Sequence, residues 1–470
     1  MLFNSLEYLV FLPLAWILFW SIPAHRITVL LIASYVFYAS WSPPYAAMVF
    51  GLVVVNYLFG LALGRVRRRR RLALAAFIAF DLGVLGLFKY FDFALRSFAA
   101  GTRALLGVEL DPPLLQLVLP LGISFFTFEF IHYLVDIYRG DVPVHSFSKF
   151  HVFAAFFPTQ IAGPIKRFQQ FVPSLATVAH FDVALAREGL GLIGRGLAKK
   201  VLLADRLAPW ANRGFSAATD GSIGTGDAWL VTLAFSLQIF FDFSGYTDIA
   251  RGSAALFGFR IPINFDGPYL ATSLADFWHR WHISLSTWLR DYVYIPLGGS
   301  RRMRIVVMRN LIVTMLLGGL WHGAAWHFVA WGGLWGIGLA LHHLLRPRFA
   351  PRSSLPTLVA GWLLTQTFVL VGWVLFRADS FSSVGVMLRA MVGFGGHSSL
   401  LTAKDMFFIV GTGTALLVAT LVTRRGWTVR LPLPTGWARP IFYGAAAALV
   451  ILVGSITAPT GREAFIYFQF

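Results

Sequence analysis

The chain has 470 residues, of which 57% are hydrophobic and only 13% charged, whereas ordinary soluble domains contain about 25% charged residues, so its composition excludes a typical soluble protein. It contains no cysteine, which excludes disulfides, thiolate metal sites and cysteine nucleophiles. The net charge is +18, and the chain's arginines and lysines cluster in short loops. Such a distribution is typical of loops that orient a chain in a membrane, and it argues against nucleic-acid binding.

Several segments of the chain are almost as long as the roughly 20 apolar residues that cross a bilayer. Among them are residues 6–22, 44–63, 72–90, 358–376, 406–422 and 441–456. The first has no basic leading region and no small-residue cleavage site, and further spans follow it, so we expect a retained helix rather than a signal peptide. The sequence therefore predicts an all-α polytopic membrane protein.

Clusters of arginine and lysine predict which loops face the cytoplasm, because such loops are not translocated. The clusters are at residues 65–71, 199–200, 301–304, 346–352 and 424–430. Three crossings before the first cluster and three after residue 352 put both termini on the extracytoplasmic side. The same clusters favour contact with anionic membrane lipid.

The middle of the chain, from about residue 114 to 335, differs from the two ends. Its apolar stretches are shorter, and "FFPTQIAGPIKRF" at 156–168 carries two prolines and a glycine, which predicts a broken or re-entrant element. Irregular backbone at membrane depth is tolerated only where protein or a water-filled cavity surrounds it, so we expect a cavity here. Without an internal repeat, we expect one membrane domain over 1–470, with peripheral helices at 1–113, a catalytic core at 114–345 and C-terminal helices at 346–470.

The segment "SLADFWHRWHISLSTWLRDYVYIPLGG" at 273–299 is typical of one helix, with Ser273 as its cap and a broad apolar face at spacings of three and four. His279 and His282 would then lie about one turn apart on the same side. A polar-face histidine is the alternative for His279, and a hydrogen-bonded buried histidine is the alternative for His282.

His322 stands in "GGLWHGAAWHFVAWGG" at 318–333, a stretch typical of a membrane-embedded helix or hairpin. An ionisable group there is costly, and by default it faces an interior cavity and marks function. Because burial disfavours the imidazolium, we expect a neutral ring that can accept a proton as a general base. The small residues beside it would let another helix or a substrate come close. A structural histidine is the alternative for His322, and more strongly for His327.

Four histidines and several aspartates in the core also offer donors for a Zn or Fe site. Their spacings fit none of the usual patterns: H-E-x-x-H is absent, and so are the repeated histidine boxes of membrane di-iron oxygenases. We therefore expect no metal.

Five motifs occur in the order found in bacterial membrane-bound O-acyltransferases. They are "LPLGISFFTFEFIHYLVDIYRG", "FFPTQIAGPIKRF", "FDFSGYTDIARGSAALFGFRIPINFDGPY", "FWHRWHISLSTWLRDYVYIPLGG" and "LWHGAAWHF". The chain most resembles the branch that acetylates alginate, whose relatives modify cellulose, peptidoglycan and teichoic acids. The resemblance implies a bundle of about 10–12 membrane segments, some broken or re-entrant, enclosing a central tunnel.

The resemblance also implies the reaction. An acyl thioester such as acetyl-CoA enters from the cytoplasm, no cofactor stays bound, and the acceptor is reached from the outer side of a bacterial inner membrane. The "LWHG" histidine, His322, and the second histidine of "RWHISLSTWLRD", His282, are the implied catalytic residues. The chain departs from the branch at His279, where arginine is common, and at Trp335, near which many members carry a further histidine.

We expect further residues to bind or orient the substrates. These residues are Trp278, Arg290, Asp291, Tyr292, Asn310 and Trp321, with Asp276 as a second candidate carboxylate. His282, Asn310 or Tyr292 could hold the oxyanion, and Asp291 or Asp276 could orient an imidazole. An acyl-enzyme intermediate on a serine is an alternative mechanism, although the chain has no G-x-S-x-G elbow.

The expected partner is an extracytoplasmic SGNH-type polysaccharide acetyltransferase or a polysaccharide synthase complex. Two other function classes remain open: a transporter or channel for a lipid-linked sugar or acyl carrier, since broken helices with polar groups suit transport too, and a structural scaffold for a polysaccharide synthase.

Overall fold

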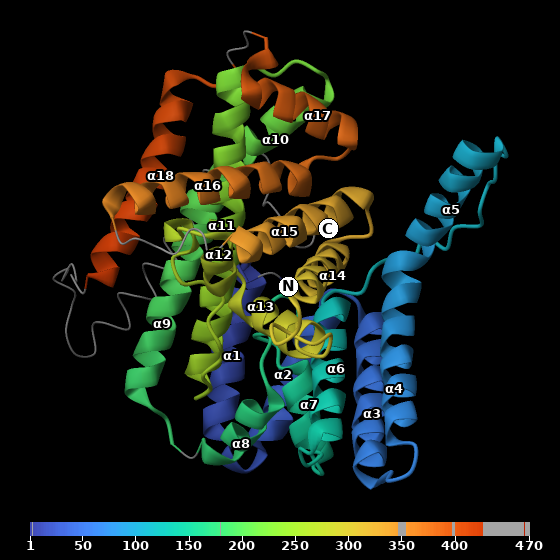
Figure 1. Ribbon diagram of the computed structural model, residues 1–470. Coiled ribbons are helices and arrows are strands. Elements are labelled where there is room, and N and C mark those ends of the chain that lie inside the picture. The colour runs from blue at the N-terminus through green and yellow to red at the C-terminus, as the bar shows by residue number, and fades with distance from the viewer. Residues whose placement is uncertain (2, 179, 346–353, 397–399, 426–464, 466–470) are drawn as a thin grey trace. The chain divides into compact units, whose positions relative to one another are not determined.

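The computed structural model describes residues 1–470 except 2, 179, 346–353, 397–399, 426–464 and 466–470 (Figure 1). Within these described residues the regular elements are all helices, and one isolated bridge joins Gly224 to Gly396. The prediction of an all-α protein is confirmed. The chain forms two compact units, Met1–Gly189 with Ala250–Pro262 and Leu190–Ile249 with Ile263–Phe470. The predicted subdivision at residues 113 and 345 stays a prediction.

The first unit carries the N-terminal helices. They are α1 (Leu6–Ser21), α2 (Arg26–Ala39), α3 (Pro43–Arg65), α4 (Arg70–Leu85), α5 (Phe91–Leu106), α6 (Ile123–Arg139), α7 (Phe147–Ala155) and α8 (Phe168–Thr177). α3 and α4 lie side by side (Figure 1), and between them Asn56 Nδ2 donates to Asp81 Oδ1 over 2.8 Å.

The second unit carries the segments that hold both candidate histidines. Its helices are α10 (Asp205–Thr219), α12 (Leu274–Arg280), α13 (Ile283–Leu289), the π-helix η5 (Arg290–Tyr294), α14 (Arg304–His322), α15 (Trp326–Leu345), α16 (Leu355–Arg377), α17 (Phe381–Arg389) and α18 (Ala403–Arg424). α9 (Val183–Leu197) and α11 (Thr225–Leu256) contribute residues to both units.

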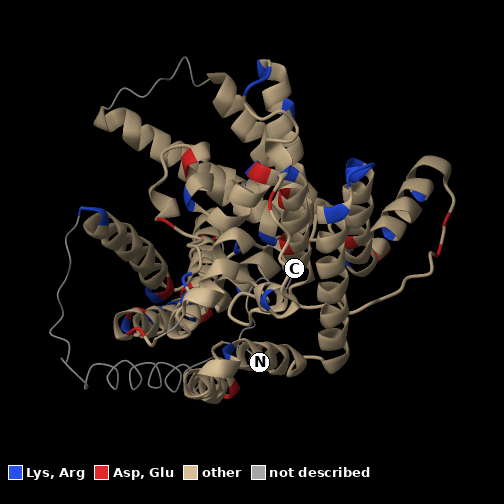
Figure 2. Cartoon of the chain, turned by 90° about the horizontal axis from the view of Figure 1, so that it is seen from below, with Lys and Arg blue, Asp and Glu red and all other residues tan. Residues whose placement is uncertain are grey.

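Seven helices of the described chain are long and apolar enough to cross a membrane, or eight spans if the bent pair α1 and α2 is one of them. Lys, Arg, Asp and Glu residues are sparse along the cartoon of the described chain (Figure 2). Four predicted spans are confirmed: three fall in α3, α16 and α18, and the span at 72–90 runs through α4 into the π-helix η2 (Gly86–Tyr90). Residues 6–22 form α1, which turns by 109° into the next helix and is therefore half of a broken pair rather than a plain span. The predicted span at 441–456 lies outside the described residues.

Three further long helices, α11, α14 and α15, correct the expectation that the middle of the chain holds only shorter stretches. Glycines interrupt the apolar pattern of α14 and α15, but they serve helix packing. A Cβ at Gly332 would stand 2.3 Å from Met315 O, and one at Gly319 would stand 2.2 Å from Phe328 O. Small residues here let the two backbones touch, as expected for membrane helices.

This close contact predicts that Gly332→Val destabilises the protein, because the new side chain would press on the backbone of α14. Overpacking of this kind costs about 1–3 kcal/mol. We expect a lower melting temperature of the purified protein in detergent. The neighbouring Gly333→Ala is the matched control, since its Cβ would meet only Leu316 Cδ2 at 3.6 Å. Equal melting temperatures for the two variants would contradict this packing.

The predicted interruption at 156–168 is confirmed. α7 ends at Ala155, α8 begins at Phe168, and the residues between form turns without a helix. Protein surrounds this segment, because residues 151–166 are all buried. Lys166 Nζ donates to both carboxylate oxygens of Glu129 on α6, at 2.7 and 3.0 Å. A buried charge is tolerated when it is paired in this way.

Candidate functional site

His282 lies at a break in the segment that was expected to be one helix. Ser273 caps α12 as predicted, because its Oγ accepts from Asp276 N. α12 ends at Arg280, however, and α13 begins at Ile283. The prediction of a continuous helix over 273–299 is therefore wrong. No glycine or proline stands at the break, so the apolar periodicity gave no sign of it.

The break separates the two histidines that were expected to lie on one side of a helix. His279 is exposed on α12, whereas His282 is 0% exposed. The expectation that they are neighbours on one face is wrong. The exposure of His279 agrees with its alternative interpretation as a polar-face residue.

The backbone of His282 is left-handed, with φ 43° and ψ 53°. Of the three non-glycine residues with positive φ in the described part of the chain, Arg69 and Gln116 are exposed and His282 is buried. This conformation costs about 1–3 kcal/mol and persists only where the surroundings enforce it. Burial also lowers the pKa of His282 to about 3, so its imidazole is neutral at physiological pH.

His322 is the last residue of α14, and the chain becomes extended at Gly323. The imidazole is 7% exposed. Its ring centroid lies 5.0 Å from that of Trp331 on α15 and 5.1 Å from that of Phe376 on α16. Three successive helices, α14, α15 and α16, thus supply the imidazole and two of the rings that pack on it.

The two imidazoles contact the same indole. The ring centroid of Trp321 lies 5.9 Å from that of His282 and 4.8 Å from that of His322. Phe243 of α11 packs on His282, with the two ring centroids 4.6 Å apart. The structure therefore brings together three predicted site residues, His282, Trp321 and His322. We call this group the imidazole cluster.

Trp278 borders the imidazole cluster through other aromatic rings. Its ring centroid lies 5.9 Å from that of Trp331, which itself contacts His322. It also lies 5.2 Å from Trp335. Trp335 is 1% exposed and fills an aromatic core.

Four other predicted site residues gather around η5 and the beginning of α14. Arg290 Nε donates to Asp291 Oδ1 over 2.8 Å, and the ring centroid of Tyr292 lies 5.3 Å from that of Trp288. Asn310 is fully buried and donates to Gly299 O over 3.3 Å. It stands 12 residues before His322 on one helix, or about 18 Å along the axis at 1.5 Å per residue. Their roles stay predictions.

Both carboxylates proposed to orient an imidazole face arginines. Asp276 Oδ1 accepts from Arg280 Nε over 2.7 Å, as Asp291 does from Arg290. His327 has a backbone contact, with Nδ1 3.2 Å from Leu375 O, which agrees with its structural interpretation. Among the residues that the structure describes, no three His, Asp or Glu side chains come together as metal ligands.

Sequence reasoning missed several neighbours of the cluster: Phe243, Trp331 and Phe376. Each comes from a different helix, and only the fold shows that they meet. Phe243 stands within "FDFSGYTDIARG", a motif that carried the resemblance but suggested no contact with a histidine.

Comparisons with known proteins agree with the motifs. The sequence profile of the MBOAT, membrane-bound O-acyltransferase family, matches residues 123–384. The probable alginate O-acetylase AlgI of Pseudomonas aeruginosa is 43% identical over 402 residues, covering 84% of this chain and 75% of that protein. The protein of the same name from Azotobacter vinelandii is 44% identical over 432 residues, covering 91% and 85%. The peptidoglycan O-acetyltransferase of Helicobacter pylori is 36% identical over 411 residues, covering 80% and 75%.

Proposed function

Since the chain belongs to the membrane-bound O-acyltransferase family, we propose that this acyltransferase moves an acetyl group from a cytoplasmic thioester, such as acetyl-CoA, towards hydroxyls of an extracytoplasmic polysaccharide. Relatives named for alginate and peptidoglycan O-acetylation support the choice of acetyl group and glycan. The observation that carries the proposal is the imidazole cluster, two buried histidines on one indole in otherwise aromatic surroundings.

His322 acts as the general base in this proposal. Its neutral imidazole takes the proton from the acceptor hydroxyl while the oxygen attacks the thioester carbonyl carbon. The new C–O bond gives a tetrahedral oxyanion, which collapses as the C–S bond breaks. The imidazolium then returns the proton to the departing thiolate, so free CoA and the acetyl ester leave a neutral histidine.

His282 is the proposed donor to the oxyanion. A neutral imidazole carries one N–H group, and a pKa of about 3 keeps His282 in this form. A fixed donor of this kind in a site without bulk water is worth more than the same hydrogen bond in water. Trp278 and Trp321 would form the walls around the acetyl group.

The donor's phosphates would bind near η5. Arg290 is exposed there, and Arg301, Arg302 and Arg304 in the following loop are exposed too. Guanidinium groups bind phosphate oxygens through paired hydrogen bonds. Their clustering next to η5 supports entry of acetyl-CoA from the cytoplasmic side.

The same charge pattern supports a multi-pass protein of the bacterial inner membrane with both termini on the extracytoplasmic side. The final polysaccharide acceptor would be chosen by a partner, an SGNH-type acetyltransferase or a polysaccharide synthase complex. Anionic lipid would bind the arginine-rich loops.

Release of CoA separates this proposal from a transporter or a scaffold. Membranes that contain the protein are incubated with acetyl-CoA and a hydroxyl acceptor, and free CoA is measured against membranes without it. We expect protein-dependent CoA release that needs the acceptor. A transporter of acyl carriers would move the thioester intact, and a scaffold would do neither.

A further inference from the structure

The left-handed turn at His282 is fixed by residues 264–266, which precede η4 (Pro268–Leu270). Asn264 O accepts from Ile283 N over 3.0 Å. Asn264 Oδ1 accepts from Ser284 N over 3.2 Å and from Ser284 Oγ over 2.6 Å. Three hydrogen bonds thus join one asparagine to the two residues that directly follow His282.

The other side of the turn is tied to the same segment. Asp266 N donates to Arg280 O over 3.0 Å, so hydrogen bonds stand both before and after the pair Trp281 and His282. Asn264 itself is 0% exposed, and its Nδ2 lies 3.4 Å from Thr247 Oγ1 on α11. A fully buried polar side chain is retained only where its hydrogen bonds are made.

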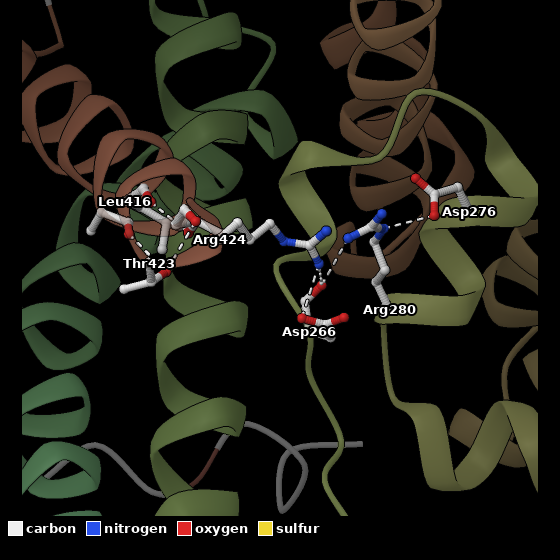
Figure 3. Close-up of polar contacts among 8 residues, drawn as sticks. Asp266, Asp276, Arg280, Leu416, Thr423 and Arg424 are labelled. Carbon is white, nitrogen blue, oxygen red and sulfur yellow. Dashed lines mark hydrogen bonds and ion pairs between the residues drawn. The ribbon is translucent and has the colours of Figure 1, made fainter. Parts of the chain in front are cut away.

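A chain of charged contacts holds this segment from outside (Figure 3). Arg424, at the end of α18, lies 2.9 Å from Asp266 Oδ1 and donates to Asp266 O over 3.0 Å. Arg280 Nη1 approaches the same carbonyl at 3.4 Å, while its Nε binds Asp276. The segment of residues 264–266 is therefore tied to both α12 and α18.

We propose that Asn264 is a positioning residue, which sets the orientation of the His282 imidazole against Trp321 by holding the left-handed turn. This inference rests on the proposed function, because it needs His282 to take part in acyl transfer. Without the Asn264 side chain, the acceptor of both Ser284 bonds is lost and the turn can relax towards the right-handed region that non-glycine residues prefer. The imidazole would then move away from the reacting atoms.

A double-mutant cycle in the full-length protein tests this proposal. Asn264→Ala, His282→Ala and the double variant are compared for acetyl transfer per folded molecule. We expect Asn264→Ala to lower kcat by tenfold or more with KM for acetyl-CoA nearly unchanged, since small displacements of a reacting group are costly. If Asn264 acts through His282, the double variant is no slower than His282→Ala alone.

The matched control is Asn56→Ala, which removes an equally buried and hydrogen-bonded asparagine from the first unit. It should lose stability but keep kcat. Multiplicative losses in the double variant, or full kcat in Asn264→Ala, would overturn the positioning role. If Asn264→Ala does not fold, Ser284→Ala replaces it in the cycle, because it removes only the bond from Oγ; we expect a smaller loss that again disappears in the His282→Ala background.

The cycle also separates the two proposals. A fully active His282→Ala would remove the histidine from the proposed function and the positioning role with it. An inactive His282→Ala together with a fully active Asn264→Ala would contradict only the positioning role.

Discussion

Replacing His322 by Asn is expected to lower acetyl transfer by at least about a hundredfold, the usual scale for loss of general-base catalysis. Asparagine fills part of the same space beside Trp331 and Phe376 but cannot take a proton from a hydroxyl. The measurement is acetyl ester formation from labelled acetyl-CoA by purified protein. Because the loss is chemical, we expect membrane insertion and melting temperature to change little.

His327 offers a matched control for that variant. It lies on the neighbouring helix α15, but its Nδ1 contacts Leu375 O, so its role is interpreted as structural. His327→Asn should keep transfer within a few-fold of the unchanged protein. Full activity in His322→Asn, or an equal loss in both variants, would remove His322 from the chemistry.

Replacing His282 is expected to lower kcat by about a hundredfold or more, the scale measured for loss of an oxyanion donor. His282→Gly is the informative variant, since glycine adopts the left-handed backbone of this position without a steric cost and leaves no donor. His282→Ala loses the donor and also strains the turn. We therefore expect both variants to be slow and the alanine variant to be the less stable one.

Stability and turnover together distinguish a chemical from a structural histidine here. If His282→Gly keeps full turnover while His282→Ala only reduces the amount of folded protein, the buried imidazole serves the turn and not the reaction. Melting temperature and kcat of the same preparations decide between these outcomes.

Much of the fold could be predicted from the sequence, because membrane helices are local features. Length and apolarity alone identified α3, α4, α16 and α18. For α14 and α15 they indicated only the part at 318–333 and missed the full length, because glycines such as Gly332 resemble interruptions until the packing of the neighbouring helix is known. Length and apolarity also failed to predict the helix break at His282. Hydrogen bonds from residues 264–266 stabilise the break, and no glycine or proline at this position indicates it in the sequence.

The candidate site likewise contains residues that the sequence could identify and contacts that only the fold shows. Motifs identified His282, Trp321 and His322, and the structure brings these three together. Spacing could not show that Asn310 lies about three turns from His322 on the same helix, because the helix bounds were not known. Nor could it identify Asn264, whose contacts with Ser284 span 20 residues of sequence. Contacts of this kind depend on the folded backbone.

The most direct test of the account is a sided assay in liposomes that contain the purified protein. Labelled acetyl-CoA is supplied only on the face of the arginine-rich loops, and a polysaccharide acceptor with its partner acetyltransferase only on the other face. The account predicts labelled acetyl esters on the far side, no intact acetyl-CoA there, and loss of the label with His322→Asn. Acetyl esters that form equally well with His322→Asn would contradict it.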